Sequence, residues 1–157
     1  MPQSALFTGI IPPVSTIFTA DGQLDKPGTA ALIDDLIKAG VDGLFFLGSG
    51  GEFSQLSAEE RKTIARFAID HVDRRVPVLI GTGGTNARET IALSQHAQQA
   101  GAVGIVVINP YYWKVSEANL IRYFEQVADS VTLPPLVSGQ VPSALVQAAV
   151  MVVPLAV

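Results

Sequence analysis

Short apolar runs alternate with amphipathic stretches four times along this sequence, and this alternation limits its fold more than any other feature. The apolar runs are residues 8–18, 43–47, 76–81 and 104–108. The last three runs consist almost entirely of apolar residues and glycine, which is typical of parallel strands buried on both faces. A strand followed by a helix, repeated in this way, predicts a parallel α/β sheet with crossover helices.

The stretches between the apolar runs carry helix signals. Helices are expected over residues 25–38, from Ser57 onward, over residues 85–100 and over residues 116–128. Ser57 and Glu60 match a capping box, in which the serine oxygen faces the first amides and the glutamate reaches back. Gly40 and Gly101 are expected to end the first and third helices.

Two architectures are built from such units, the doubly wound open sheet and the closed barrel. The first strand is not followed by a G-x-G-x-x-G turn, and this favours the barrel. A whole barrel needs about 250 residues, whereas this chain has 157. We therefore expect an α/β fold that is a partial (β/α)8 TIM barrel, with about its first four βα units over residues 1–134.

Composition excludes several classes of function. The net charge is −4 and the basic residues are scattered, so a nucleic-acid surface is not expected. The chain has no cysteine, which excludes disulfides and thiolate metal sites. No secretory signal is visible at the N-terminus, and we expect a cytoplasmic protein that binds a small molecule without a metal or cofactor.

The end of the chain differs in composition from the rest. Residues 131–157 contain no charged side chain, but four prolines interrupt the apolar span that a membrane helix would need. A membrane partner is therefore not expected. We expect residues 135–157 to form an atypical apolar tail, and a premature stop or a frameshift that replaced the second half of the barrel would explain it.

The best candidate site is the turn Gly48-Ser49-Gly50-Gly51-Glu52, which follows the second strand. Ligands of both architectures bind at the carboxyl ends of the strands. Three glycines and a hydroxyl in one tight turn allow backbone amides to approach a carboxylate or a phosphate. A glycine-rich turn without any ligand is an equally good interpretation, and Glu52 is expected to anchor the turn.

Three other features of the sequence are considered as candidate sites. Asn109-Pro110-Tyr111-Tyr112-Trp113 follows the fourth strand, and such an aromatic cluster suits a subunit interface or a pocket that uses a phenol as a proton relay. The turn at residues 81–86 lacks the lysine of a phosphate-binding loop and is expected to be a tight turn with a helix cap. His71 and His96 lie in predicted helices and are expected to be structural.

Taken together, the turn at residues 48–52 and the Asn-Pro-Tyr-Tyr sequence at residues 109–112 resemble the dihydrodipicolinate synthase and N-acetylneuraminate lyase family of pyruvate-handling barrels. The opening Gly9-Ile10-Ile11-Pro12-Pro13-Val14-Ser15-Thr16 agrees with this resemblance. The Ser-Gly version of the turn looks most like bacterial 2-keto-3-deoxygluconate-type aldolases. The likeness covers roughly residues 5 to 134.

The resemblance implies a class I aldolase, in which a lysine forms a Schiff base with a 2-oxo acid and a tyrosine shuttles protons. By this resemblance Ser49 and the Gly50 amide hold the pyruvate carboxylate within the turn formed with Gly48 and Gly51. Tyr112 matches a family tyrosine that reaches across a dimer interface, which implies a homo-oligomer. Glu52 has a structural role.

The chain also departs from the family pattern. Relatives often have threonine at the position of Gly50, and Ser138 stands where a family tyrosine is expected. The lysines of this chain, Lys26, Lys38, Lys62 and Lys114, match none of the family's catalytic positions, so the Schiff-base lysine is expected to be missing here.

These departures leave other functions open. One is a non-catalytic half barrel that self-associates to bury its open sheet edges. A weaker possibility is a phosphate-binding protein built on the turn at residues 81–86.

Overall fold

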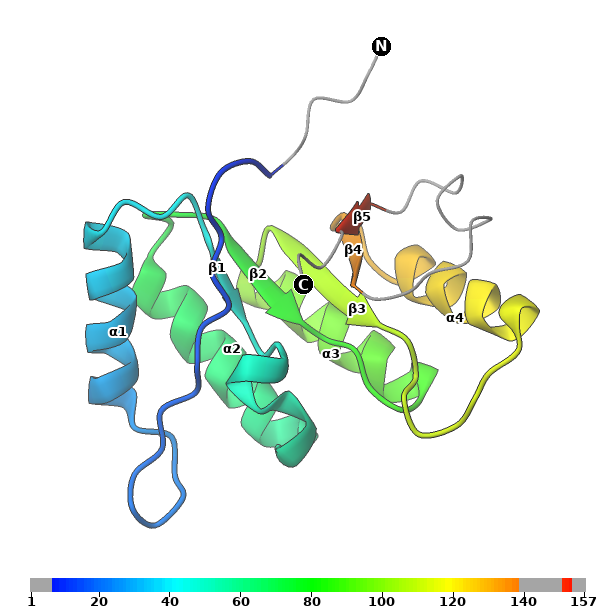
Figure 1. Cartoon of the computed structure of the whole chain (residues 1–157), viewed down its shortest axis with the longest axis horizontal. Coiled ribbons are helices and arrows are strands. Elements are labelled where there is room, and N and C mark those ends of the chain that lie inside the picture. The colour runs from blue at the N-terminus through cyan, green and yellow to red at the C-terminus, as the bar shows by residue number, and fades with distance from the viewer. Residues whose placement is uncertain (1–6, 139–150, 154–157) are drawn as a thin grey trace.

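A computed structural model describes residues 7–138 and 151–153, and these residues form alternating strands and helices (Figure 1). The strands of this part are β1 (Leu44–Phe46), β2 (Val78–Gly81), β3 (Gly104–Ile108), β4 (Pro135–Ser138) and β5 (Met151–Val153). The helices are α1 (Lys26–Lys38), α2 (Ala58–Val72), α3 (Ala87–Ala100) and α4 (Glu117–Asp129), and two short 3-10 turns, η1 (Ser49–Gly51) and η2 (Phe53–Gln55), follow β1. The expected succession of βα units is confirmed.

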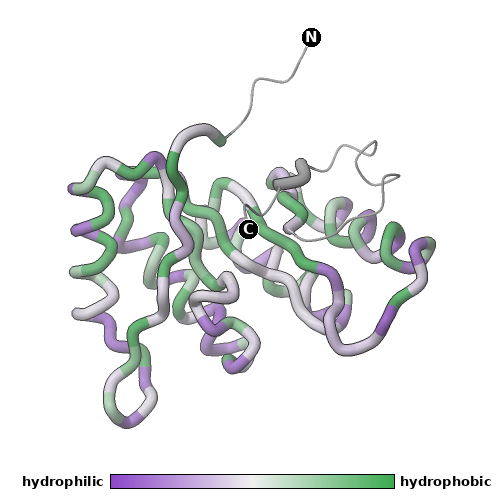
Figure 2. Tube along the Cα trace, in the orientation of Figure 1, coloured by the Kyte–Doolittle hydropathy of each residue, from purple (hydrophilic) through white to green (hydrophobic). Residues whose placement is uncertain are grey.

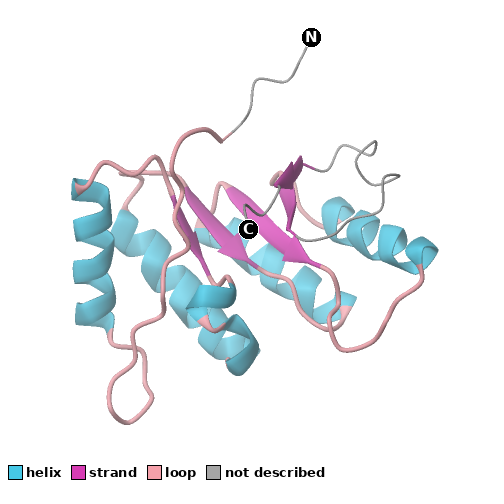
Figure 3. Ribbon diagram, viewed as in Figure 1, coloured by secondary structure: helices cyan, strands magenta, loops and turns pink. Residues whose placement is uncertain are grey.

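The strands pair in chain order, β1-β2-β3-β4-β5, and every pair is parallel. A doubly wound sheet reverses its strand order at one point, whereas this order runs in one direction, as in a barrel. Figure 3 shows the helices along one side of the sheet, and each of α1, α2 and α3 contacts the next helix in the chain. The architecture is therefore that of a partial TIM barrel.

The first expected strand, at residues 8–18, is an extended segment and not a regular strand. Pro13 forms a single parallel bridge with Phe45. Around this bridge the Val14 amide donates to the Phe45 carbonyl at 2.8 Å, and the Phe45 amide donates to the Pro12 carbonyl at 3.1 Å. Two consecutive prolines supply no N–H groups, so a continuous ladder cannot form. The segment nevertheless lies beside β1, where the first strand of the barrel was expected.

The two faces of the sheet hold separate sets of apolar side chains, because successive residues of a strand point to opposite faces. The larger core lies between sheet and helices, where Phe46, Ile80 and Ile105 pack with helix residues such as Phe124. The other face carries a smaller cluster whose buried members are Leu79, Val106 and Leu136, packed with Phe7, Ile11 and Phe45. Figure 2 shows the strands as mainly hydrophobic and the helices as alternating in hydropathy.

Helix starts agree with the sequence signals. The Asp25 carboxylate accepts from the Gly28 amide at 3.0 Å at the start of α1. The capping box of α2 is confirmed, because the Glu60 amide donates to the Ser57 hydroxyl and the Ser57 amide donates to the Glu60 carboxylate. These bonds satisfy amides that have no partner within the helix.

The regular pattern extends past Pro134, since β4 occupies residues 135–138 and pairs with β3. Most of the expected tail, residues 139–150 and 154–157, lies outside the described residues. None of the helices in the described part of the chain combines the length and apolar character that crossing a membrane requires.

Candidate functional site at the carboxyl ends of the strands

Three loops meet the carboxyl edge of the sheet, where the strands β1, β2 and β3 end. They are residues 47–57, 82–86 and 109–116. Because neighbouring strands are parallel, their carboxyl ends lie along one edge, which is where barrels of this kind carry their sites. Both motifs that were singled out by sequence, residues 48–52 and residues 109–113, lie on these loops.

The turn after β1 begins with a buried leucine in an unusual conformation. Leu47 has a φ of +60° and is only 3% exposed, and Glu52 has a φ of +57°. Between them the Gly51 amide donates to the Gly48 carbonyl at 3.0 Å, and the Glu52 amide donates to the Ser49 carbonyl at 3.1 Å. These bonds fold the turn back on itself and leave Ser49 and Gly50 exposed at its tip.

The three glycines of this turn differ in the space around them. A Cβ at Gly48 would lie 2.7 Å from the Phe45 ring, and one at Gly51 would lie 3.1 Å from the Val14 carbonyl oxygen. A Cβ at Gly50 would have no heavy atom within 4 Å. A side chain at Gly48 or Gly51 would therefore crowd its neighbours, whereas the position of Gly50 has room for one.

A threonine from the first extended segment holds the turn in place. The Thr16 hydroxyl donates to the Gly51 carbonyl at 2.7 Å, and this contact is partly buried. It joins residues that are 35 positions apart in the chain. The hydroxyl therefore fixes the peptide that leads from Gly51 into Glu52.

Glu52 links the two 3-10 turns through its backbone. Its amide closes η1, and its carbonyl accepts from the Gln55 amide at 2.9 Å in η2. Its side chain belongs to an exposed residue. This geometry supports a structural role for Glu52, which remains a prediction.

The loop after β3 exposes three aromatic side chains. Tyr111, Tyr112 and Trp113 are 53%, 73% and 76% exposed. The Tyr112 and Trp113 rings meet edge to face at 5.2 Å, and the Tyr111 ring meets Phe53 of η2 edge to face at 6.0 Å. The loop is thus in direct contact with η2, which follows the turn at residues 48–52, the candidate cradle for a carboxylate. It presents a large apolar surface to solvent.

The loop after β2 is a tight turn with a helix cap, as expected. The Asn86 side chain accepts from the Glu89 amide at 2.9 Å and caps α3. Residues 81–84 are buried, and a Cβ at Gly83 would lie 2.7 Å from the Ile108 side chain. A buried loop of this kind leaves little room for a phosphate group.

Arg61 is an important residue that the sequence analysis missed. It is 3% exposed, and its Nη2 donates to the carbonyls of Gly81 and Gly83 at 3.1 and 2.9 Å. Burial lowers the pKa of this guanidinium, while the charge of Glu89 acts in the opposite direction. Its position in the sequence could have indicated this role. Arg61 comes three residues before Ile64 and so lies on the apolar face of α2, where a charged residue needs buried hydrogen-bond partners.

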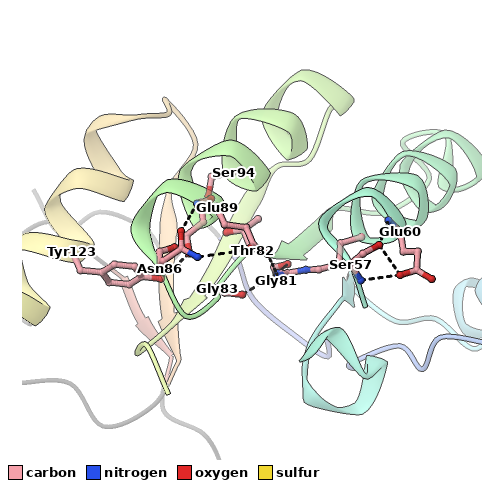
Figure 4. A network of polar contacts seen from close by, with 11 residues as sticks. Ser57, Glu60, Gly81, Thr82, Gly83, Asn86, Glu89, Ser94 and Tyr123 are labelled. Atoms are coloured by element: carbon pink, nitrogen blue, oxygen red, sulfur yellow. Dashed lines mark hydrogen bonds and ion pairs between the residues drawn. The ribbon is translucent and has the colours of Figure 1, made fainter. Parts of the chain in front are cut away.

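A second set of buried hydroxyls joins α3 to the loop after β2 and to α4 (Figure 4). The Ser94 hydroxyl donates to the Thr82 hydroxyl at 2.9 Å, and the hydroxyls of Thr90 and Tyr123 lie 3.0 Å apart. Burial raises the pKa of Tyr123. This network satisfies polar groups beneath the carboxyl edge and fixes the helix starts there.

The two histidines lie away from this edge, on helices. The His71 Nε2 is 3.0 Å from the Asp34 carboxylate, which also pairs with Arg75 at 2.8 Å. His96 lines an open pocket of about 740 Å³ on the outer face of the helices, together with Lys62 and Arg66. Within the described residues, no group of three side chains suits a metal ion.

None of the four lysines lies on a strand, and Lys114 is the one that belongs to a loop at the carboxyl edge. Lys26 and Lys38 are in α1, Lys62 is in α2, and Lys114 is in the exposed loop after β3. Ser138 ends β4 and pairs with Ile108 of β3. The described strand ends and the turn after β1 offer hydroxyls and backbone amides for binding.

Comparison with known proteins identifies the family. The sequence profile of the Dihydrodipicolinate synthetase family matches residues 6–151, which is most of the chain. The chain belongs to this family. Among curated proteins, YagE of Escherichia coli (strain K12) is 91% identical over 146 residues, which cover 89% of this chain and 48% of YagE. A 4-hydroxy-tetrahydrodipicolinate synthase of Salinibacter ruber is 40% identical and covers 85% of this chain and 44% of that protein.

Solved structures of dihydrodipicolinate synthetase family members agree with the fold. The crystal structure of YagE, a prophage protein from E. coli K12 in complex with pyruvate, superposes with a TM-score of 0.85 at 93% identity, covering 87% of this chain and 46% of that chain. A dihydrodipicolinate synthase from Aquifex aeolicus superposes with a TM-score of 0.83 at 32% identity, covering 85% and 45%. The chain thus spans about half the length of the curated relatives that it matches.

Proposed function

We propose that this member of the dihydrodipicolinate synthetase family carries the carboxylate-binding part of a pyruvate-dependent class I aldolase. The observation that carries the proposal is the turn at residues 48–52. It exposes the Ser49 hydroxyl and the Gly50 backbone at the carboxyl edge of a partial barrel. Hydroxyls and backbone amides in such turns bind small anions.

The relatives support pyruvate and a sugar acid as substrates. YagE was crystallised with pyruvate. YagE is named as a candidate 2-dehydro-3-deoxy-D-gluconate aldolase and YjhH of the same organism as a candidate 2-dehydro-3-deoxy-D-pentonate aldolase. We infer cleavage of a 2-keto-3-deoxy sugar acid to pyruvate and an aldehyde as the reaction of the whole barrel.

The chemistry of such a barrel depends on an imine. A lysine amine condenses with the 2-oxo group and releases water. The resulting iminium accepts the electron pair of the bond between the α- and β-carbons as that bond breaks, while the β-hydroxyl gives up its proton to a base and becomes the aldehyde carbonyl. In this chain Ser49 and the Gly50 amide would hold the carboxylate of the 2-oxo acid. None of the four lysines lies on a strand, so we propose that the imine-forming lysine is not among the residues of this chain.

Tyr112 is the proposed proton relay, acting in the site of a neighbouring subunit. Its exposure of 73% and its contact with Trp113 suit a side chain that a partner covers. Aromatic residues are enriched at the centres of such interfaces. We therefore propose a homo-oligomer in which this loop lies at the interface.

A second candidate function is a non-catalytic half barrel that self-associates. The exposed aromatic cluster of Tyr111, Tyr112 and Trp113 favours self-association independently of any catalysis. The two candidate functions differ in whether pyruvate binds at Ser49 and Gly50. Only the aldolase-derived site requires this binding.

The deciding experiment is a pyruvate titration of the isotopically labelled chain, followed by NMR. We expect the amide resonances of Ser49, Gly50 and Gly51 to shift, and Ser49→Ala to weaken binding. Ser54→Ala is the matched control, because Ser54 is an exposed serine in the next 3-10 turn. Unchanged resonances at residues 48–52 at saturating pyruvate would exclude the proposed site and favour the non-catalytic half barrel.

Trapping with cyanoborohydride tests the lysine proposal separately. Cyanoborohydride reduces an imine to a stable adduct, so intact-protein mass spectrometry reports any Schiff base formed with pyruvate. We expect an unmodified mass. An adduct on one of the four lysines would show that this chain forms the imine itself.

A further inference from the structure

The guanidinium of Arg61 lies where the loops after β1, β2 and β3 come together. Its Nη2 donates to the carbonyl of Gly81, the last residue of β2, and to the carbonyl of Gly83 in the loop after β2. The centre of the guanidinium lies 5.2 Å from the centroid of the Phe53 ring, in the 3-10 turn after β1. One side chain thus contacts the loops that follow two neighbouring strands.

Phe53 extends this contact to the third loop. The Phe53 ring also meets the Tyr111 ring edge to face at 6.0 Å and at an interplanar angle of 83°. Phe53 itself is 8% exposed, so it is held on both sides. The side chains of Arg61, Phe53 and Tyr111 therefore form a continuous series of contacts. It leads from the buried residues beneath the carboxyl edge to the exposed aromatic loop.

The groups that accept hydrogen bonds from the Arg61 guanidinium or stack on it are neutral, namely two backbone carbonyls and an aromatic ring. The nearest carboxylate is that of Glu89, at 3.9 Å from Nη1, and the Glu89 side chain is 40% exposed. The buried Nε of Arg61 makes no hydrogen bond with any of the described residues. A buried cation held in this way by carbonyls and one ring face stabilises a fold less than a well-packed apolar side chain of the same size would. What arginine contributes here is the orientation of the groups around it. A planar guanidinium can hydrogen-bond in its plane and stack on its face at the same time.

We propose that Arg61 is a positioning residue that sets the conformation of the loop bearing Tyr112, acting through Phe53 and Tyr111. The end of β2 and the start of the loop after it provide the fixed base, since the Gly81 and Gly83 carbonyls hold the guanidinium and residues 81–84 are buried. The inference rests on the proposed function in one respect only, the role of Tyr112 as a proton relay. The series of contacts itself is independent of that role.

Trp113 provides a specific signal for the test, because it is the only tryptophan of the chain and adjoins Tyr112. Its indole N–H gives a single resonance in a nitrogen-correlated NMR spectrum. In Arg61→Met, which keeps an unbranched side chain but removes the charge and the planar donor group, we expect this resonance and the amides of Tyr111 and Tyr112 to shift. Arg61→Lys should restore part of the shift, since it retains a donor and a charge near the Phe53 ring.

Two further variants keep the test decisive. Phe53→Leu interrupts the series of contacts without removing the buried charge, and it should shift the same loop resonances while Arg61 remains bound to Gly81 and Gly83. Arg66→Met is the matched control, because Arg66 is an exposed arginine of the same helix. It should leave the loop resonances in place.

The result that would overturn the proposal is a folded Arg61→Met variant whose Tyr111, Tyr112 and Trp113 resonances match those of the parent chain. If Arg61→Met does not fold, unchanged loop resonances in Phe53→Leu overturn it equally. A purely structural role would lower the melting temperature of both variants without moving these resonances. All spectra are recorded without pyruvate, so failure of the proposed pyruvate site would not alter their outcome.

Discussion

The carbonyl of Leu47 lies directly against the Cα of Gly81, so closely that any Cβ at Gly81 would collide with it. Leu47 follows β1 and has a φ of +60°, while Gly81 ends β2. The left-handed conformation turns the chain sharply into Gly48 and the cradle. The Leu47 carbonyl can therefore take up this position only because residue 81 has no side chain.

Gly81→Ala tests this arrangement. The new methyl group would force the Leu47 carbonyl away in a buried region, and overpacking of this kind costs about 1–3 kcal/mol. We expect a corresponding loss in the free energy of unfolding, measured by urea denaturation. Gly50→Ala is the control, because a Cβ there meets nothing within 4 Å. Equal stability of the two variants would refute the close packing at Gly81.

Local patterns were enough to predict most of the scaffold. The strands β2 and β3 follow from apolar runs that are typical of buried parallel strands. Helix α2 follows from its capping box and α1 from its apolar spacing, since both signals depend on residues a few positions apart. The placement of residues 48–52 and 109–113 at one edge follows from the parallel order of the strands.

Long-range contacts account for what local patterns could not predict. The partners of Arg61 lie 20 and 22 positions away, and Thr16 reaches Gly51 across 35 positions. The residues next to Arg61 and Thr16 in the sequence do not indicate these partners. The local sequence shows only a polar residue at a buried or half-buried position. The irregular first strand has a different cause, since Pro12 and Pro13 remove the donors that a ladder needs.

The capping box of α2 predicts different effects for two serines that precede helices. Ser57→Ala removes a hydroxyl that accepts from the Glu60 amide, and loss of such a cap costs about 1 kcal/mol. Ser116 occupies the same position before α4 but makes no capping hydrogen bond with its side chain. We therefore expect Ser116→Ala to change the urea midpoint much less than Ser57→Ala does. The reverse order would argue against the assigned caps.

We expect the folded chain to lose stability in mild acid because of His96. Burial lowers the pKa of His96 below its ordinary value of 6.5, and the neighbouring charges of Arg66 and Lys62 lower it further. Between the folded-state pKa and 6.5 the unfolded chain binds the proton more strongly, so stability falls as the pH drops through this window. Urea unfolding at several pH values should show this slope.

Two variants assign the slope to His96. His96→Gln should remove this contribution, and Arg66→Gln should reduce it by raising the pKa of His96 toward its ordinary value. An NMR titration of the His96 ring measures that pKa directly. A His96 pKa at or above 6.5 in the parent chain would contradict the prediction.

The hydroxyl of Thr16 predicts a change confined to the cradle. Thr16→Val keeps the shape of the side chain but removes the donor to the Gly51 carbonyl, and a net loss of about 1 kcal/mol is expected for one such bond. Because the bond fixes the peptide after Gly51, hydrogen exchange at the amides of Gly51 and Glu52 should become faster. Thr16→Ser keeps the hydroxyl and should retain slow exchange. If Thr16→Val leaves these amides as protected as Thr16→Ser does, the bond does not hold the turn, and its shape depends on the packing of Gly48 and Gly51 alone.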